Sequence, residues 1–149
     1  KFRFKLKNAK ILDLYSGTGS FGLECLSREA NKVVFVENNN KALRILVKNI
    51  SKLKISEKTS VIESSVSSFL ALDSFLNNKV DLIFLDPPFK EKNIFKLIEN
   101  IYLKNLLGKN GILVIHRNKK TKDIYPKNFK ILDVKNYGIS KIIFGNLSL

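Results

Sequence analysis

A chain of 149 residues fits one domain, and its 44% hydrophobic content supplies enough apolar side chains for a buried core. No apolar run approaches the roughly 18 residues that a membrane-spanning helix needs, and a single cysteine, Cys25, excludes an internal disulfide. The formal net charge of +14 indicates a polyanionic partner such as nucleic acid.

Short apolar runs alternate with helical patterns along the chain. We predict strands where apolar or β-branched residues run together, and helices where apolar residues recur every three or four positions. The predicted strands are residues 10–14, 32–36, 59–63, 80–85, 111–115, 129–136 and 139–144. The predicted helices are residues 20–28, 39–53, 66–76 and 91–106. Tyr137-Gly138 lies between the last two strands and indicates a hairpin turn.

The order of these elements predicts an α/β fold. Strands that alternate with helices form a parallel sheet with helices on both faces. We therefore expect a Rossmann-like, seven-stranded, mostly parallel sheet with a C-terminal antiparallel hairpin. Ligands bind such sheets at the carboxyl ends of the strands. We expect one site there, because four polar or Gly/Pro clusters follow strands: residues 13–22, Glu37, residues 64–66 and residues 86–89.

A glycine-rich loop turns the first predicted strand into the first helix, from Asp13 to Gly22. Glycines let the backbone approach a ligand closely, and a helix N-terminus offers unpaired N–H groups. Glu37, at the end of the second strand, can accept both hydroxyls of a ribose. We assign cofactor binding in this region to Asp13, Tyr15, Ser16, Gly17, Gly19, Glu37 and Asn38.

Two cofactors fit this loop. Gly17-x-Gly19-x-x-Gly22 also spells the dinucleotide fingerprint, with an acid downstream. A pyrophosphate at a helix N-terminus is disfavoured by a neighbouring carboxylate, whereas Asp13 would favour a cation. S-adenosylmethionine carries a cationic amino acid end and an adenosine ribose, so the pattern favours it over a nicotinamide cofactor.

The segment Asp86-Pro87-Pro88-Phe89 follows the most strand-like stretch of the chain. Two successive prolines predict a rigid, extended turn whose carbonyls point outward. Asp86 and the carbonyl of Pro87 can accept the two hydrogens of an exocyclic amine, and Phe89 can stack on its ring. These contacts would hold a weakly nucleophilic amine with its lone pair toward an activated methyl group. We predict that these four residues form the catalytic loop of an amine methyltransferase, with Asp86 also beside the cofactor.

At this point the chain resembles a known family. The segments Asp13-Leu-Tyr-Ser-Gly-Thr-Gly-Ser-Phe-Gly-Leu-Glu-Cys-Leu-Ser-Arg-Glu-Ala30 and Asp81-Leu-Ile-Phe-Leu-Asp-Pro-Pro-Phe89 resemble those of bacterial 16S ribosomal RNA guanine-N2-methyltransferases that act on guanine 966. The resemblance implies a class I methyltransferase fold, S-adenosylmethionine as cofactor and a guanine amine as substrate. It also implies 16S rRNA or the small ribosomal subunit as partner, a cytoplasmic location, and Ser65 and Val66 beside the adenine.

Several alternatives stay open. N6-adenine and glutamine-N5 methyltransferases usually carry Asn where this chain has Asp86, and an RNA-binding module without catalysis belongs to another class. Relatives usually carry an acid near His116, which we expect to be a strand-end residue without a catalytic role. We expect a monomer without a metal ion. Residues 1–149 would form one methyltransferase domain that lacks its native N-terminal segment, since the chain starts with Lys1 and contains no methionine.

Overall fold

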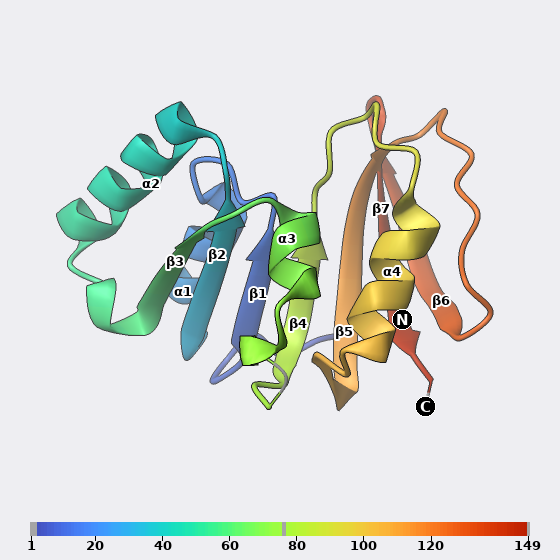
Figure 1. Ribbon diagram of the computed structural model, residues 1–149, viewed down its shortest axis with the longest axis horizontal. Coiled ribbons are helices and arrows are strands. Elements are labelled where there is room, and N and C mark those ends of the chain that lie inside the picture. The colour runs from blue at the N-terminus through green and yellow to red at the C-terminus, as the bar shows by residue number, and fades with distance from the viewer. Residues whose placement is uncertain (1–2, 76, 149) are drawn as a thin grey trace.

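Seven strands form one sheet in the order β3-β2-β1-β4-β5-β7-β6 (Figure 1). The computed structural model describes residues 3–75 and 77–148. The strands are β1 (Lys10–Leu14), β2 (Lys32–Glu37), β3 (Thr59–Glu63), β4 (Val80–Leu85), β5 (Leu107–Asn118), β6 (Phe129–Tyr137) and β7 (Ser140–Leu147). The α-helices are α1 (Ser20–Ser27), α2 (Asn40–Leu53), α3 (Val66–Ala71) and α4 (Ile94–Leu103), and two 3₁₀ turns are η1 (Ser56–Lys58) and η2 (Asp73–Phe75).

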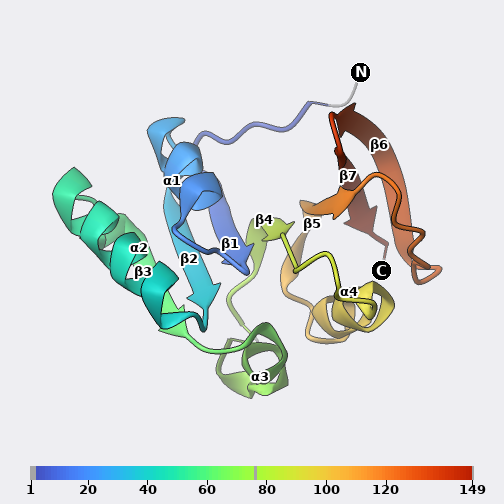
Figure 2. The same cartoon turned by 90° about the horizontal axis from the view of Figure 1, so that it is seen from above.

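The five strands β1 to β5 pair in parallel, whereas β7 is antiparallel to both β5 and β6. Viewed from above, α1 and α2 cover one face of the sheet and α3 and α4 cover the other (Figure 2). The interior of β1, β2 and β4 is therefore buried on both sides, as continuous apolar strands require. The predicted fold class, with its parallel sheet and C-terminal hairpin, is confirmed.

Several predicted boundaries differ from the observed ones. Helix α4 ends at Leu103, before residue 106, because Asn105 adopts a positive φ of 50° that stops a helix. Helix α3 ends at Ala71, after which the chain turns extended at Leu72, and residue 76 of that predicted helix lies outside the described residues. Strand β5 begins at Leu107 rather than at residue 111, with a shift of its register against β4.

Gly22 sets how closely α1 packs on β2. A Cβ atom at this position would overlap the side chains of Phe35 and Val33, both of which are fully buried in β2. Only glycine therefore allows α1 to lie at this distance from the sheet. The same close approach places the N-terminus of α1, and the glycine-rich loop before it, over the carboxyl end of β1 (Figure 1).

We expect Gly22→Ala to lower the free energy of unfolding by about 1–2 kcal/mol. The added methyl group overpacks the core, and the higher helix propensity of alanine offsets part of that cost. Urea unfolding measures the change. Ser20→Ala is the matched control, because Ser20 is exposed in the same helix, and its effect should stay within about 0.5 kcal/mol. Equal effects of the two substitutions would contradict the packing argument.

Candidate active site

The carboxyl ends of β1, β2, β3 and β4 meet at one edge of the sheet, and a cavity of about 180 Å³ opens there. Five predicted cofactor-binding residues line it together, from three different segments: Tyr15, Glu37, Asn38, Ser65 and Val66. Glu91 lines the same cavity, and no local sequence signal had indicated it. A larger groove between α2 and β3 contains none of the predicted site residues.

The glycine-rich loop is tied to β2 by its backbone. Ser16 donates its N–H to the carbonyl of Val36, at 3.1 Å, and Gly17 donates to the Glu37 carboxylate, at 2.7 Å. Gly17 and Gly19 have φ values of 55° and 88°, which glycine adopts without strain. Tyr15 has a positive φ of 59° without being a glycine, so the start of the loop is conformationally demanding.

Glu37 is oriented by three backbone N–H groups. Its Oε2 accepts from Gly17, and its Oε1 accepts from Asn38 and Asn39, each at 2.9 Å. A carboxylate has about four acceptor positions, so about one remains. That position is on Oε2, because Oε1 already accepts two bonds, so a diol that binds both oxygens must displace the bond from Asn38 or Asn39.

Asp13 is a buried acid at the end of β1, with 1% of its surface exposed. Its Oδ2 accepts the N–H of Gly22, at 3.1 Å, and so caps α1, whose own N-cap residue is a glycine. Its Oδ1 has no hydrogen-bond partner among residues 3–75 and 77–148. Burial raises the pKa of Asp13 to about 8, opposed by the Gly22 bond and aided by the carboxylates of Asp86 and Glu37. An orphaned, buried acid of this kind fits a cationic ligand.

Two more predicted residues beside the cavity are shaped by their surroundings. Burial, helped by the carboxylate of Glu91, raises the pKa of Tyr15 to about 12, so its hydroxyl stays a hydrogen-bond donor. The Ser65 hydroxyl caps α3 by accepting the N–H of Ser68, at 3.1 Å. Ser65 thus already has a structural role at the position predicted for the adenine contact.

The proline loop leaves β4 at Asp86. Pro87 is buried, whereas Pro88 and Phe89 are exposed, Phe89 by 49%. The expectation that both proline carbonyls point outward is wrong for Pro88, whose carbonyl accepts the N–H of Glu91, at 2.8 Å, and Nη1 of Arg117, at 3.4 Å. The Pro87 carbonyl accepts no hydrogen bond from residues 3–75 and 77–148.

Arg117 donates hydrogen bonds to the backbone of this loop. Its side chain is 1% exposed and forms a two-pronged ion pair with Asp123, at 2.9 and 3.0 Å. Its Nη2 also donates to the carbonyl of Glu91, at 2.7 Å. A buried guanidinium needs this full set of acceptors. The sequence did not indicate this role of Arg117, because no residue near it in the chain shows that its side chain is buried against the proline loop.

His116 contacts the predicted catalytic acid. Its Nδ1 lies 2.8 Å from Oδ1 of Asp86, and its Nε2 lies 2.8 Å from Oγ of Ser140. The ring of Phe89 meets the imidazole edge to face, with centroids 5.9 Å apart. Sequence analysis had treated His116 as a strand-end residue and predicted neither contact.

The chain is similar to known methyltransferases. The family model described as Conserved hypothetical protein 95 matches residues 2–146. Ribosomal RNA small subunit methyltransferase D of Haemophilus influenzae is 36% identical over 139 residues, which cover 90% of this chain and 69% of that protein. The chain spans about two thirds of the length of three such relatives, namely 69%, 66% and 64%.

Solved structures give the same fold. A proposed methylase from Haemophilus influenzae superposes with a TM-score of 0.83 at 33% identity, covering 96% of this chain and 89% of that one. An SAH-bound methyltransferase of Podospora anserina superposes with a TM-score of 0.70 at 14% identity, covering 91% and 70%. At that identity the second match supports the fold alone.

Among the described residues, none of the helices has the length and apolar character that a membrane span requires. No cluster of three histidine, cysteine or acidic side chains within residues 3–75 and 77–148 could hold a metal ion.

Asp13 makes the stability of the protein depend on pH. Its carboxyl keeps a proton in the folded chain up to a pH of about 8, against an ordinary pKa of 3.8, so folding takes up a proton between these values. The free energy of unfolding therefore falls as pH rises. We expect the wild type to lose up to about 1.4 kcal/mol per pH unit relative to Asp13→Asn across this window. Urea unfolding of both proteins at several pH values tests this, and a constant difference would contradict it.

Arg117→Lys should destabilise the protein by about 2–3 kcal/mol, because lysine keeps the charge but cannot supply the fork of donors. Hydrogen exchange of the Glu91 amide should accelerate as well, since the loop loses its clamp. Arg28→Lys is the matched control: its ion pair with Glu24 is exposed, so its effect should stay within about 0.5 kcal/mol. Equal losses in urea unfolding would argue against the clamp.

Proposed function

Because the chain belongs to the family described as Conserved hypothetical protein 95, and its relatives include a small-subunit rRNA methyltransferase, we propose that it methylates the N2 amine of a guanine in 16S rRNA. The protein is an S-adenosylmethionine-dependent methyltransferase. Its substrate would be the small ribosomal subunit or its rRNA, in the cytoplasm, and it would act as a monomer.

The residues around the cavity fit the cofactor. Bound S-adenosylmethionine supplies a methyl group activated by its sulfonium. Glu37 would take the ribose hydroxyls, and Ser65 and Val66 would lie beside the adenine. Asp13 contributes a buried negative charge beneath the glycine-rich loop once it loses its proton, and its orphaned Oδ1 supports this role. The glycine-rich backbone lies where the amino acid end would bind.

The observation that supports the proposed reaction is the hydrogen bonding of the Asp86 carboxylate. One of its oxygens, Oδ1, is held by His116, while Oδ2 accepts no hydrogen bond from the described residues. Oδ2 and the Pro87 carbonyl would accept the two hydrogens of the amine, which directs the nitrogen lone pair toward the methyl carbon. The amine nitrogen would bond to that carbon as the carbon–sulfur bond breaks and its electron pair stays on the sulfur of S-adenosylhomocysteine, and Asp86 or water would take the surplus proton.

A carboxylate at position 86 favours guanine over adenine. Beside its amine, guanine carries a ring N1–H donor, whereas adenine carries a ring N1 acceptor. A carboxylate only accepts hydrogen bonds, so it pairs with the guanine edge and repels the adenine lone pair. Asparagine, which can also donate, would suit adenine or glutamine better. This chemistry supports the guanine assignment beyond the family relationship.

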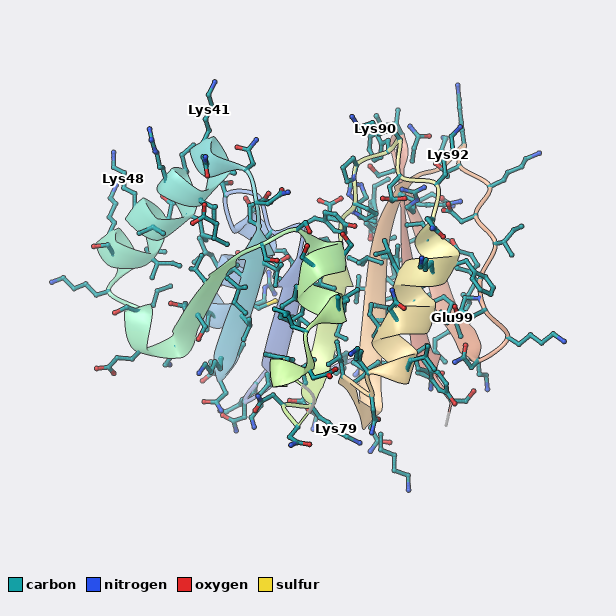
Figure 3. The ribbon with its side chains drawn as sticks, in the orientation of Figure 1. Lys41, Lys48, Lys79, Lys90, Lys92 and Glu99 are labelled. Atoms are coloured by element: carbon teal, nitrogen blue, oxygen red, sulfur yellow. The ribbon has the colours of Figure 1, made fainter. Side chains whose placement is uncertain are left out.

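The surface around the site suits RNA. Lys90 and Lys92 lie one and three residues after Phe89, at the edge of the sheet that holds the cavity, as does Lys41 at the start of α2 (Figure 3). Cations at this edge would pair with the phosphates of the substrate. The exposed ring of Phe89 would stack on a guanine that is unpaired or flipped out of its helix.

Tritiated methyl transfer to rRNA and to small subunits from cells lacking the activity tests the proposed function. Nucleoside analysis should give labelled N2-methylguanosine. Label in N6-methyladenosine or in protein would contradict the substrate. Calorimetry with S-adenosylhomocysteine and with NAD tests the cofactor separately, and tighter binding of NAD would contradict that part.

Asp86→Ala should reduce methyl transfer by about 100-fold or more, because the amine loses an acceptor and its orientation. Binding of S-adenosylhomocysteine should remain largely unchanged in calorimetry. Glu99→Ala serves as control, since Glu99 is an exposed acid on α4 that points away from the site (Figure 3). Parallel loss of transfer and of cofactor binding in Asp86→Ala would show that Asp86 belongs to the cofactor site instead.

A further inference from the structure

Three side chains from three strands form a hydrogen-bonded row at the substrate side of the site. Ser140 at the start of β7 contacts His116 in β5, which contacts Asp86 at the end of β4. We propose that His116 is a positioning residue, which fixes the Asp86 carboxylate so that Oδ2 faces the amine. The inference rests on the proposed function, because it assigns Asp86 the role of amine acceptor.

The imidazole is held on several sides. Strand β5 pairs with β7 so that Ser140 lies opposite Asn118. Asn118 is two residues after His116 and lies on the same face of β5. The Ser140 hydroxyl therefore lies close to His116, 2.8 Å from its Nε2. Phe89 packs on the ring with an interplanar angle of 75°. His116 is 24% exposed and Asp86 41% exposed, so the better-buried partner can orient the more accessible one.

The hydrogen-bonding capacities of the row fix where the protons lie. An ionised carboxylate only accepts, so Nδ1 of His116 must donate to Asp86. The Ser140 hydroxyl can then donate to Nε2 of a neutral imidazole. Each member of the row is satisfied in this arrangement, and the lone pairs of Oδ2 remain for the substrate. The acceptor of the amine is thus oriented before substrate binds.

Neighbouring charges do not replace this donor. Arg117, next in β5, turns to Asp123 and the backbone of the proline loop, and Lys141, next to Ser140, donates to the carbonyl of Thr121. Among the described residues, His116 gives Asp86 the one side-chain hydrogen bond that it accepts. Without it, the carboxylate can rotate about its own side-chain bonds.

Three variants separate positioning from packing. Asparagine places an amide nitrogen near the position of Nδ1, so His116→Asn can still donate to Asp86. Glutamine reaches the position of Nε2 instead, and alanine supplies no donor. We expect kcat for methyl transfer to fall roughly 10- to 100-fold in His116→Gln and His116→Ala, and His116→Asn to recover most of it. KM for S-adenosylmethionine should change little in all three.

The outcomes distinguish the inference from the function it rests on. Equal rates for the three variants, with transfer by the wild type intact, would overturn the inference and leave the proposed function standing. Absence of transfer to any RNA by the wild type would overturn both. A loss confined to KM for S-adenosylmethionine would place His116 in the cofactor site and also reject the positioning role.

A spectroscopic readout tests the row without any turnover. Nitrogen-15 NMR of the single histidine reports which ring nitrogen carries the proton. We expect the proton on Nδ1 in the wild type, and a shift of the population toward Nε2 in Asp86→Ala, where the acceptor is lost. Ser140→Ala should weaken the preference for Nδ1, whereas Ser140→Thr, which keeps the hydroxyl, should preserve it. An Nε2 proton in the wild type would overturn the inference.

Discussion

The position of the proline loop depends on the hydrogen bonds of the buried Arg117 guanidinium. A charge that is 1% exposed needs acceptors close by, since an unpaired buried charge would cost several kcal/mol. Four hydrogen bonds supply them: two go to Asp123, and one each goes to the carbonyls of Pro88 and Glu91. The proline loop therefore has one preferred position relative to β5. Rigidity at this loop comes from the arginine as much as from the two prolines.

Strand β5 holds the proline loop through side chains on both of its faces. Successive side chains of a strand point to opposite sides, so Arg117 and His116 cannot serve the same partner. Arg117 holds the loop's backbone, and His116 holds the carboxylate of Asp86. This division lets the acid stay accessible while the segment after it is anchored in the interior.

Local patterns predicted the elements and the carboxyl ends of β1 to β4 to within a residue, because the information for a strand, a glycine turn or a proline stop lies within a few residues. The residues that support the site could not be predicted this way. His116 and Asp86 are separated by 30 residues, and His116 and Ser140 by 24, so their contacts follow from strand order and register alone. Some predicted boundaries were wrong because a single residue ends the element. At Asn105, for example, the left-handed backbone ends α4 before the predicted residue.

The candidate site is acidic, whereas the protein as a whole is strongly basic, and the two kinds of charge would bind different ligands. Asp86 and Glu37 each help to raise the pKa of Asp13, so three acidic side chains lie close together in a chain whose net charge is +14. Concentrated negative charge disfavours a phosphate-bearing cofactor and favours a cationic one. The lysines outside it attract polyanions but cannot select a base. In the proposed function, selection of a base would come from the acceptors of the proline loop, and their orientation would depend on His116 in β5 and Ser140 in β7.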